Sequence, residues 1–444
     1  MFQTNETFTT SIIAYDNEID IFLKFIIIIY TSFEHYSYFK PIIKSNTDFF
    51  PQQSSNLNTL SIQRAILVFY PSSQEKYYLP EIRWLYRSWI EMIKYESNQW
   101  RTDLIIFTEQ YSSSLIQLGC LVNQIRTNND EQPKCRVFIY LRISARHINS
   151  LTKQQTIFAN DSEKNLFHID ISRSILLYNH LRTYPYIDSV NIIAESYSIY
   201  SYYDFILKTD LDVFITKQFA NYIPNTLKTL IAGRGGYSTQ FNTLRLGRIA
   251  RDMNWKYQNL TNVGSTWYGS PYVAQRIANL TLDAILHLFI NEFCAAEREQ
   301  KVGTLLWPDW HYGVLSMYGT HLAVNHLVNS EKLDVQNGSE LLDQSTTNND
   351  QNDIEKNNRL HLHCWHTDAP FSKFQFKENK YNHIDPHALI NDRSSLGYAM
   401  RMALESRLMT FEELGQQLRN ISRNKTNSSI FITQSNIFTA LPIQ

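Results

Sequence analysis

The stretch YYDFILKTDLDVFITKQF, residues 202–219, decides the fold. Its apolar core predicts a strand over 203–208, and Asp210 and Asp212 follow that strand directly, separated by one residue. Side chains two residues apart on an extended chain point the same way, so the two carboxylates face the same side. Two such carboxylates repel each other unless a cation lies between them. The stretch therefore predicts a site for a hard divalent cation, Mn²⁺ or Mg²⁺, at the carboxyl end of a strand.

The chain before this stretch alternates between two kinds of pattern. Continuous apolar runs, as strands buried on both faces require, alternate with segments in which apolar residues recur at helical spacing. This alternation predicts an α/β fold with a mostly parallel sheet flanked by helices, in which ligands bind beyond the carboxyl ends of the strands. The expected strands are 65–70, 104–107, 137–141 and 203–208, and the expected helices are 80–96, 112–126 and 170–182.

The second half of the chain is less regular. Its segment 231–242 holds three of the chain's 13 glycines, where the backbone could approach a ligand closely. The polar segment 331–358, rich in Asn and Asp, reads as a flexible insertion. The remaining expectations are a strand over 262–269, helices over 272–298 and 310–328, a short strand over 360–365 and a mainly helical segment over 387–420.

Composition excludes several classes of protein. The 444 residues carry a net charge of −1, without the basic surplus of a general nucleic-acid binder. Hydrophobic residues make up 43% of the chain, which allows a large core and excludes wholesale disorder. The four cysteines form no CxxC pair, so four thiols, one disulfide and two disulfides all remain open. Motifs of P-loop, dinucleotide-binding, zincin and α/β-hydrolase proteins are absent.

The strand followed by TDLDVF resembles the DxD signature of GT-A glycosyltransferases, the nucleotide-diphospho-sugar transferase superfamily. The resemblance covers roughly residues 62–400 and points to an uncharacterised branch. It implies a Rossmann-like GT-A domain that moves a sugar from a UDP- or GDP-sugar to a hydroxyl of a glycan, protein or small-molecule acceptor. In such enzymes one aspartate meets the ribose or metal and the other binds the metal, and these would be Asp210 and Asp212. The further stretches that carry the resemblance are 100–107, 262–269, 307–311 and 361–366.

A late histidine often supplies a third metal ligand in this family. The segment RLHLHCWH, residues 359–366, offers His363 or His366 for this role, and Lys373 would balance the diphosphate charge. The alternative is a histidine that stacks on Trp365 in the core. A metallo-β-lactamase-like zinc site is disfavoured, because Trp365 stands where that motif requires an aspartate.

Asp309 is the candidate catalytic base, because many inverting GT-A enzymes place a carboxylate facing the acceptor at the start of a helix. The alternative is an acid that only interacts with the helix dipole. Gly264 would let the backbone approach the sugar, and Trp267 would stack on it or pack in the core. Arg234 and Arg83 are candidate phosphate contacts.

The expected organisation is an N-terminal extension, one catalytic domain and a tail. The apolar segment 19–30 spans about 18 Å as a helix, short of a bilayer, so a packed or interfacial helix is favoured over an anchor. As a functional expectation, a single-pass protein of the Golgi or ER lumen is slightly favoured, and a cytoplasmic location stays open. The divisions are 1–61, 62–420 (nucleotide half 62–212, acceptor half 213–420) and 421–444.

Two alternatives to glycosyl transfer remain. A haloacid-dehalogenase-like phosphatase would use Asp210 as its nucleophile, but Phe214 replaces the Thr or Val of that signature. A non-catalytic sugar-binding relative would keep the fold and lose the metal chemistry.

Overall fold

The computed structural model divides into two units, Met1–Ser55 and Asn56–Gln444. The first unit, with the apolar segment 19–30, lies outside the described residues, and so does the tail after residue 421. The structure describes residues 61–127, 130, 132–148, 155–156, 166–300, 307–338, 340–364 and 370–421.

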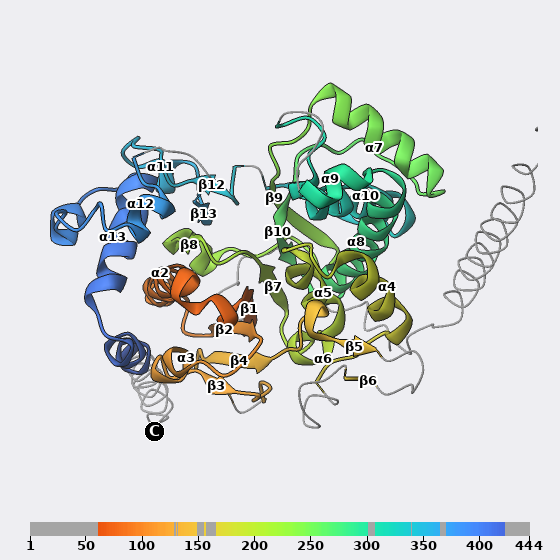
Figure 1. The fold of residues 1–444 in the computed structure, drawn as a ribbon. Helices are drawn as coiled ribbons and strands as arrows, with labels where there is room; N and C mark the ends of the chain where they lie inside the picture. The colour runs from red at the N-terminus through yellow and green to blue at the C-terminus, as the bar shows by residue number, and fades with distance from the viewer. Residues whose placement is uncertain are drawn as a thin grey trace, which may run out of the picture. The chain divides into compact units, whose positions relative to one another are not determined.

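An eight-stranded sheet forms the centre of the second unit, in the order β11-β9-β10-β7-β1-β2-β4-β3 (Figure 1). All neighbouring strands pair in parallel except β10, which runs antiparallel to both β7 and β9. Because β9 and β7 therefore point the same way, their carboxyl ends lie at one edge of the sheet. The strands are β1 (Ile62–Tyr70), β2 (Trp100–Thr108), β3 (Leu121–Val122), β4 (Cys135–Ile139), β7 (Phe205–Lys208), β9 (Thr229–Arg234), β10 (Val263–Gly269) and β11 (Asp334–Asn337).

Helices cover both faces of this sheet, which explains why its strands read as continuous apolar runs. Along β1, Ile66 and Val68 belong to one buried core and Ala65 and Leu67 to the other. The predicted α/β class, a mostly parallel mixed sheet flanked by helices, is confirmed. The first core includes α2 (Glu75–Ile93) and α13 (Ser395–Leu408), and the second α4 (Ile171–Leu181), α5 (Ile187–Glu195), α8 (Pro271–Asn291) and α10 (Leu315–Ser330).

One predicted helix is wrong in extent. The helix expected over 112–126 stops as α3 (Ser113–Gln117), because Gly119 takes a φ of +80° and a disulfide joins Cys120 to Cys135 of β4. The segment 231–242 contains the end of β9 at Arg234 and the start of α7 (Gln240–Asp252).

Residues 331–358 were expected to form a flexible insertion, but they contribute one strand to each of two sheets. β11 pairs with β9 at the edge of the main sheet. β12 (Gln344–Ser345) pairs with β13 (His361–His363), which also pairs with β8 (Val213–Ile215) in a small second sheet. This second sheet ties the segment to the chain that directly follows Asp212. The remaining elements are α6 (Tyr197–Tyr200), α9 (Ala295–Gln300), α11 (Asp353–Lys356), α12 (Lys373–Lys377), β5 (His147–Ile148) and β6 (Gln155–Thr156).

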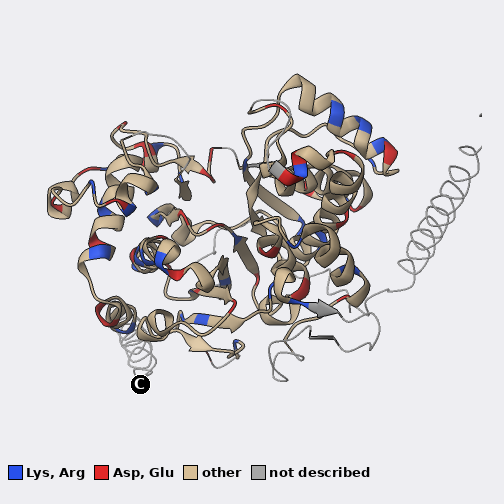
Figure 2. Ribbon diagram, viewed as in Figure 1, with Lys and Arg blue, Asp and Glu red and all other residues tan. Residues whose placement is uncertain are grey.

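Within the described residues, α8 is the one helix whose length and apolar composition would suit a membrane span, and 50% of its apolar window is buried inside the fold. Figure 2 shows acidic and basic residues interspersed along the helices and strands. Many of them pair, as Arg64 does with Glu96 and Arg146 with Glu195 in the interior.

Candidate cation-binding site

Asp210 and Asp212 lie in the short connection between β7 and β8. The amide of Cys364 donates a hydrogen bond to the carbonyl of Asp212 at 2.9 Å, and His363 pairs with Val213 across β13 and β8. This register places His363 beside the aspartates. Ligand atoms of Asp210, Asp212 and His363 all lie within 4.8 Å of one another. The structure thus brings together three of the predicted ligands, whereas His366 lies outside the described residues.

Asp212 forms the closest charge contacts of the three residues. Its Oδ1 lies 3.3 Å from His363 Nε2, and its Oδ2 lies 2.5 Å from the ammonium of Lys373. Burial alone would raise the pKa of Asp212, but His363 and Lys373 hold it well below its usual value. Burial would lower the pKa of His363, but the surrounding carboxylates, Asp212 foremost, raise it to about 9. In the cation-free protein, positive charge from the protein itself stabilises the Asp212 carboxylate.

Asp210 is the more accessible ligand, with 37% of its side chain exposed. The hydroxyl of Ser265, on β10, donates to its Oδ2 at 3.1 Å. Lys208 donates to the carbonyl of Ser265 at 2.9 Å, and its ammonium lies 3.7 Å from Asp210 Oδ1. Ser265, in the first half of β10, therefore orients Asp210.

Sequence reasoning missed Asp343, which lies in the segment expected to be an insertion. Its side chain is 1% exposed, and Thr266 Oγ1 donates to its Oδ1 at 2.6 Å. The same Oδ1 lies 3.8 Å from His363 Nδ1. Burial raises the pKa of Asp343 to about 6, although His363 opposes the shift. No periodicity or motif surrounds this residue; it directly precedes β12, and the pairing of β12 with β13 brings it to His363.

His361 neighbours the site without contributing to the cluster of ligand atoms. Its Nδ1 accepts a hydrogen bond from the Asp343 amide at 3.1 Å, so the neutral ring carries its proton on Nε2. That nitrogen lies 2.7 Å from Thr209 Oγ1 and donates to it. Burial lowers the pKa of His361 to about 3, which keeps the ring neutral and its contact with Asp343 uncharged. His361 thus fixes the backbone of the site.

The donor set fits a divalent cation with mixed ligand preferences. Carboxylate oxygens suit Mg²⁺ and Mn²⁺ alike, whereas an imidazole nitrogen suits transition metals. Two carboxylates and one histidine therefore fit Mn²⁺ better than Mg²⁺, and leave coordination positions for a substrate.

Other predicted residues take structural positions. Trp267 is 1% exposed, and its indole N–H donates to the Gly264 carbonyl at 3.3 Å, so it packs in the core and presents no face to a sugar. A Cβ at Gly264 would lie 2.7 Å from the Gly233 carbonyl carbon, so its close approach is to β9. The Arg83 side chain donates to the Ser406 carbonyl at 2.9 Å and lies over the Phe411 ring, which leaves it no role as a phosphate contact.

Asp309 does not begin a helix, because the helical segment starts as a 3-10 turn at Tyr312, capped by His311, and continues as α10 from Leu315. Its loop is held to α7: the amide of Trp310 donates to Asn242 Oδ1 at 3.0 Å, and the carbonyl of Pro308 accepts from Asn242 Nδ2. Asp309 Oδ1 is buried without a hydrogen-bond partner among the described residues. The cluster of Asp210, Asp212 and His363 does not include it.

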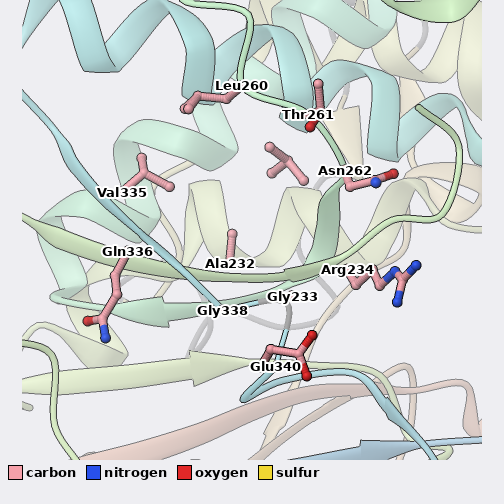
Figure 3. Close-up of a pocket in the computed structure, with 11 residues that line it drawn as sticks. Ala232, Gly233, Arg234, Leu260, Thr261, Asn262, Val335, Gln336, Gly338 and Glu340 are labelled. Atoms are coloured by element: carbon pink, nitrogen blue, oxygen red, sulfur yellow. The ribbon is translucent and has the colours of Figure 1, made fainter. Parts of the chain in front are cut away.

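A cavity of about 480 Å³ opens at the same edge of the sheet, beside β9 and β11 (Figure 3). Figure 3 shows Gln336 and Arg234 on opposite sides of it, with Glu340 between them in this view. Val263, at the start of β10, lines the cavity, and β10 pairs directly with β7, so the cavity begins one strand from the end of β7, or about 5 Å along the edge. The lining residues are Ala232, Gly233, Arg234, Leu260, Thr261, Asn262, Val263, Val335, Gln336, Gly338 and Glu340.

Comparison with known proteins gives a distant structural likeness and a family. A bifunctional glycosyltransferase, WbbM, in its apo form is 8% identical at a TM-score of 0.37, over 82% of this chain and 52% of that one, so the chain spans about half its length. The galactosyltransferase LgtC, in complex with donor and acceptor sugar analogues, is 9% identical at a TM-score of 0.36, over 71% of this chain and 94% of that one. No curated protein is significantly similar. A family model matches residues 58–432, and the chain therefore belongs to the family described as a domain of unknown function, DUF7164.

Proposed function

We propose that this protein is a metal-dependent glycosyltransferase that moves a sugar from a nucleoside-diphosphate sugar to a hydroxyl acceptor. The observation that carries the proposal is the cluster of Asp210, Asp212 and His363, whose ligand atoms lie within 4.8 Å of one another beyond the carboxyl end of β7. In a sheet of this kind the ligand crevice lies at that edge.

Each side chain of the site has a defined task in this proposal. Asp210, Asp212 and His363 would hold Mn²⁺, which would stabilise the negative charge that develops on the departing nucleoside diphosphate. The ammonium of Lys373 lies 2.5 Å from Asp212, and when the donor binds it would also neutralise part of the negative charge of the diphosphate. Asp309, with its unpartnered buried Oδ1, is the proposed base for the acceptor hydroxyl.

The cavity beside β9 and β11 is the proposed acceptor site. Its wall combines Arg234, Gln336 and Asn262 with apolar Leu260 and Val335, a mixture that suits a hydroxylated ring with one polar and one apolar face. Because β10, which lines it at Val263, pairs directly with β7, an acceptor bound there would lie beside a donor held at the end of β7.

Calorimetric titration of the full chain with UDP and with GDP, each with and without Mn²⁺, tests the proposal. We expect one nucleotide to bind with Mn²⁺, and EDTA or Asp212→Asn to abolish that binding. Asp252→Asn, which removes an exposed carboxylate on α7, is the matched control and should bind as wild type does. Absence of metal-dependent binding to either nucleotide would refute the proposal, and sugar binding that persists in EDTA would favour the non-catalytic alternative.

The haloacid-dehalogenase alternative requires Asp210 to act as a nucleophile on phosphate esters. Phosphate release from p-nitrophenyl phosphate that disappears in Asp210→Asn would support it, and absence of such release removes it.

A further inference from the structure

We propose that Asp343 is a positioning residue of the cation site, which holds the His363 ring with Nδ1–H toward the Asp343 carboxylate and Nε2 toward Asp212 and the cation. The inference rests on the proposed function, because it concerns the same cation. It adds a side chain that belongs to no motif, contributed by the polar segment between β11 and β12.

The His363 ring bridges two carboxylates through its two nitrogens. Nε2 lies 3.3 Å from Asp212 Oδ1, and Nδ1 lies 3.8 Å from Asp343 Oδ1 on the other side of the ring. The ligand cluster contains Asp212 and not Asp343, so the two carboxylates have different tasks. A carboxylate that accepts from the second nitrogen of a metal-bound histidine fixes the orientation of the ring and makes the ligating nitrogen more basic.

Asp343 is itself held from several directions. Its Oδ1 accepts from Thr266 Oγ1 at 2.6 Å, and its amide donates to His361 Nδ1 at 3.1 Å. Its Oδ2 is buried and has no hydrogen-bond partner among the described residues. A buried carboxylate oxygen without a partner is unfavourable. The oxygen that faces His363 is Oδ1, 3.8 Å from Nδ1, and a small movement of His363 upon cation binding would bring the ring N–H within hydrogen-bond distance of it.

The main sheet leaves a space for this carboxylate. A Cβ at Gly233, on β9, would lie 1.7 Å from Asp343 Oδ2, so the carboxylate rests directly over the glycine backbone. Any side chain at this position would displace Asp343 from His363. The glycine, the threonine and the aspartate thus come from β9, β10 and the segment before β12, and together they form one support for His363.

The test is a double-variant cycle on Mn²⁺ affinity of the full chain, measured by electron paramagnetic resonance of free Mn²⁺. We expect Asp343→Asn to weaken binding roughly 10–100-fold, the usual effect of removing such a support. In a His363→Ala background the same change should have no further effect, because Asp343 acts through that ring. Equal loss in both backgrounds would show a direct electrostatic role and overturn the inference, as would an unchanged affinity of Asp343→Asn.

The control is Asp353→Asn, which removes another carboxylate that is 1% exposed, bonded to Ser395 and Arg359 away from the ligand cluster. It should lower stability and leave Mn²⁺ affinity unchanged. Wild-type protein that binds no Mn²⁺ would overturn the proposed function together with this inference, whereas binding that Asp343→Asn retains overturns the inference alone.

A crystal structure of the wild-type protein with Mn²⁺ decides the matter if the variants do not fold. We expect Nε2 of His363 as the ligand atom and an Asp343 oxygen within hydrogen-bond distance of Nδ1. Ligation through Nδ1, or Asp343 in the coordination sphere, would overturn the inference.

Discussion

Replacement of Gly233 by alanine tests the close contact between β9 and Asp343. The added Cβ would lie 1.7 Å from Asp343 Oδ2 and 2.6 Å from its Cγ. Because such contacts do not occur below 3.0 Å, the carboxylate must withdraw by about 1.3 Å, the difference between 3.0 and 1.7 Å. That movement breaks the 2.6 Å hydrogen bond from Thr266.

The expected loss of stability follows from these contacts. A hydrogen bond to a charged group contributes about 1.5–3 kcal/mol. Alanine is favoured over glycine within a strand by roughly 0.5–1 kcal/mol, which offsets part of the loss. We therefore expect Gly233→Ala to lower the free energy of unfolding by about 1–2 kcal/mol, measured by urea denaturation and circular dichroism.

Asp343→Ala provides the decisive comparison. Once the carboxylate is absent, the alanine at 233 has nothing to displace, so the double variant should be no less stable than Asp343→Ala alone. Gly247→Ala, in α7, is the control. Its Cβ would lie 3.3 Å from a Tyr257 ring atom, which a shift of a few tenths of an ångström relieves, and alanine favours the helix, so we expect a much smaller loss than for Gly233→Ala. Additive losses from the two substitutions, or full stability of Gly233→Ala, would refute the reasoning.

Three further predictions concern other parts of the molecule. Reduction of the Cys120–Cys135 disulfide, or Cys135→Ser, should lower the free energy of unfolding by about 3 kcal/mol, because the bond closes a loop with a sequence separation of 15. A melting temperature that dithiothreitol does not change would contradict this. Burial lowers the pKa of His321 to about 3, so the unfolded chain takes up a proton below about pH 6.5 that the folded chain refuses. His321 alone should therefore lower stability by about 1.4 kcal/mol per pH unit from pH 6 to 4, and His361, whose pKa burial also lowers to about 3, adds a similar slope. Although His321→Gln alters the bonds to Tyr237 and Tyr257, it should reduce the total slope by one proton in urea unfolding. Lys373→Met should weaken binding of the Mn²⁺–nucleotide complex, measured by calorimetry. Binding of Mn²⁺ without nucleotide should be unchanged or tighter, because the Lys373 ammonium competes with the cation for Asp212. An equal loss of affinity for both would show that Lys373 only maintains the fold.

Strands that are buried on both faces were predictable from the sequence. Helices cover the sheet on both sides, so its central strands read as continuous apolar runs; these are β1, β2, β4 and β7. Asp210 and Asp212 were predicted from their place after a strand, whereas His363, offered together with His366, and Lys373 were expected from the resemblance to GT-A enzymes.

Residues whose role depends on long-range pairing were not predictable. Asp343 lies in a polar segment with no periodicity, and only the pairing of β12 with β13 brings it to His363. From the sequence, Trp267 could stack on a sugar or pack in the core. In the structure it packs in the core and its indole N–H donates to the Gly264 carbonyl. The short helix α3 ended early because of the Gly119 backbone and a disulfide partner 15 residues away, neither of which alters the hydrophobic pattern.

The small sheet of β8, β13 and β12 joins segments of the chain that are far apart in sequence at the candidate cation site. Asp212 and Lys373 are separated by 161 residues, and His363 reaches the aspartate only through the pairing of β13 with β8. A cation held by Asp212 and His363 would therefore act as a cross-link between the middle and the late part of the chain. Contacts of such long sequence separation form slowly, so the site would be completed late in folding. Saturating Mn²⁺ at about 100 times its Kd would therefore stabilise the folded protein by about 2.7 kcal/mol.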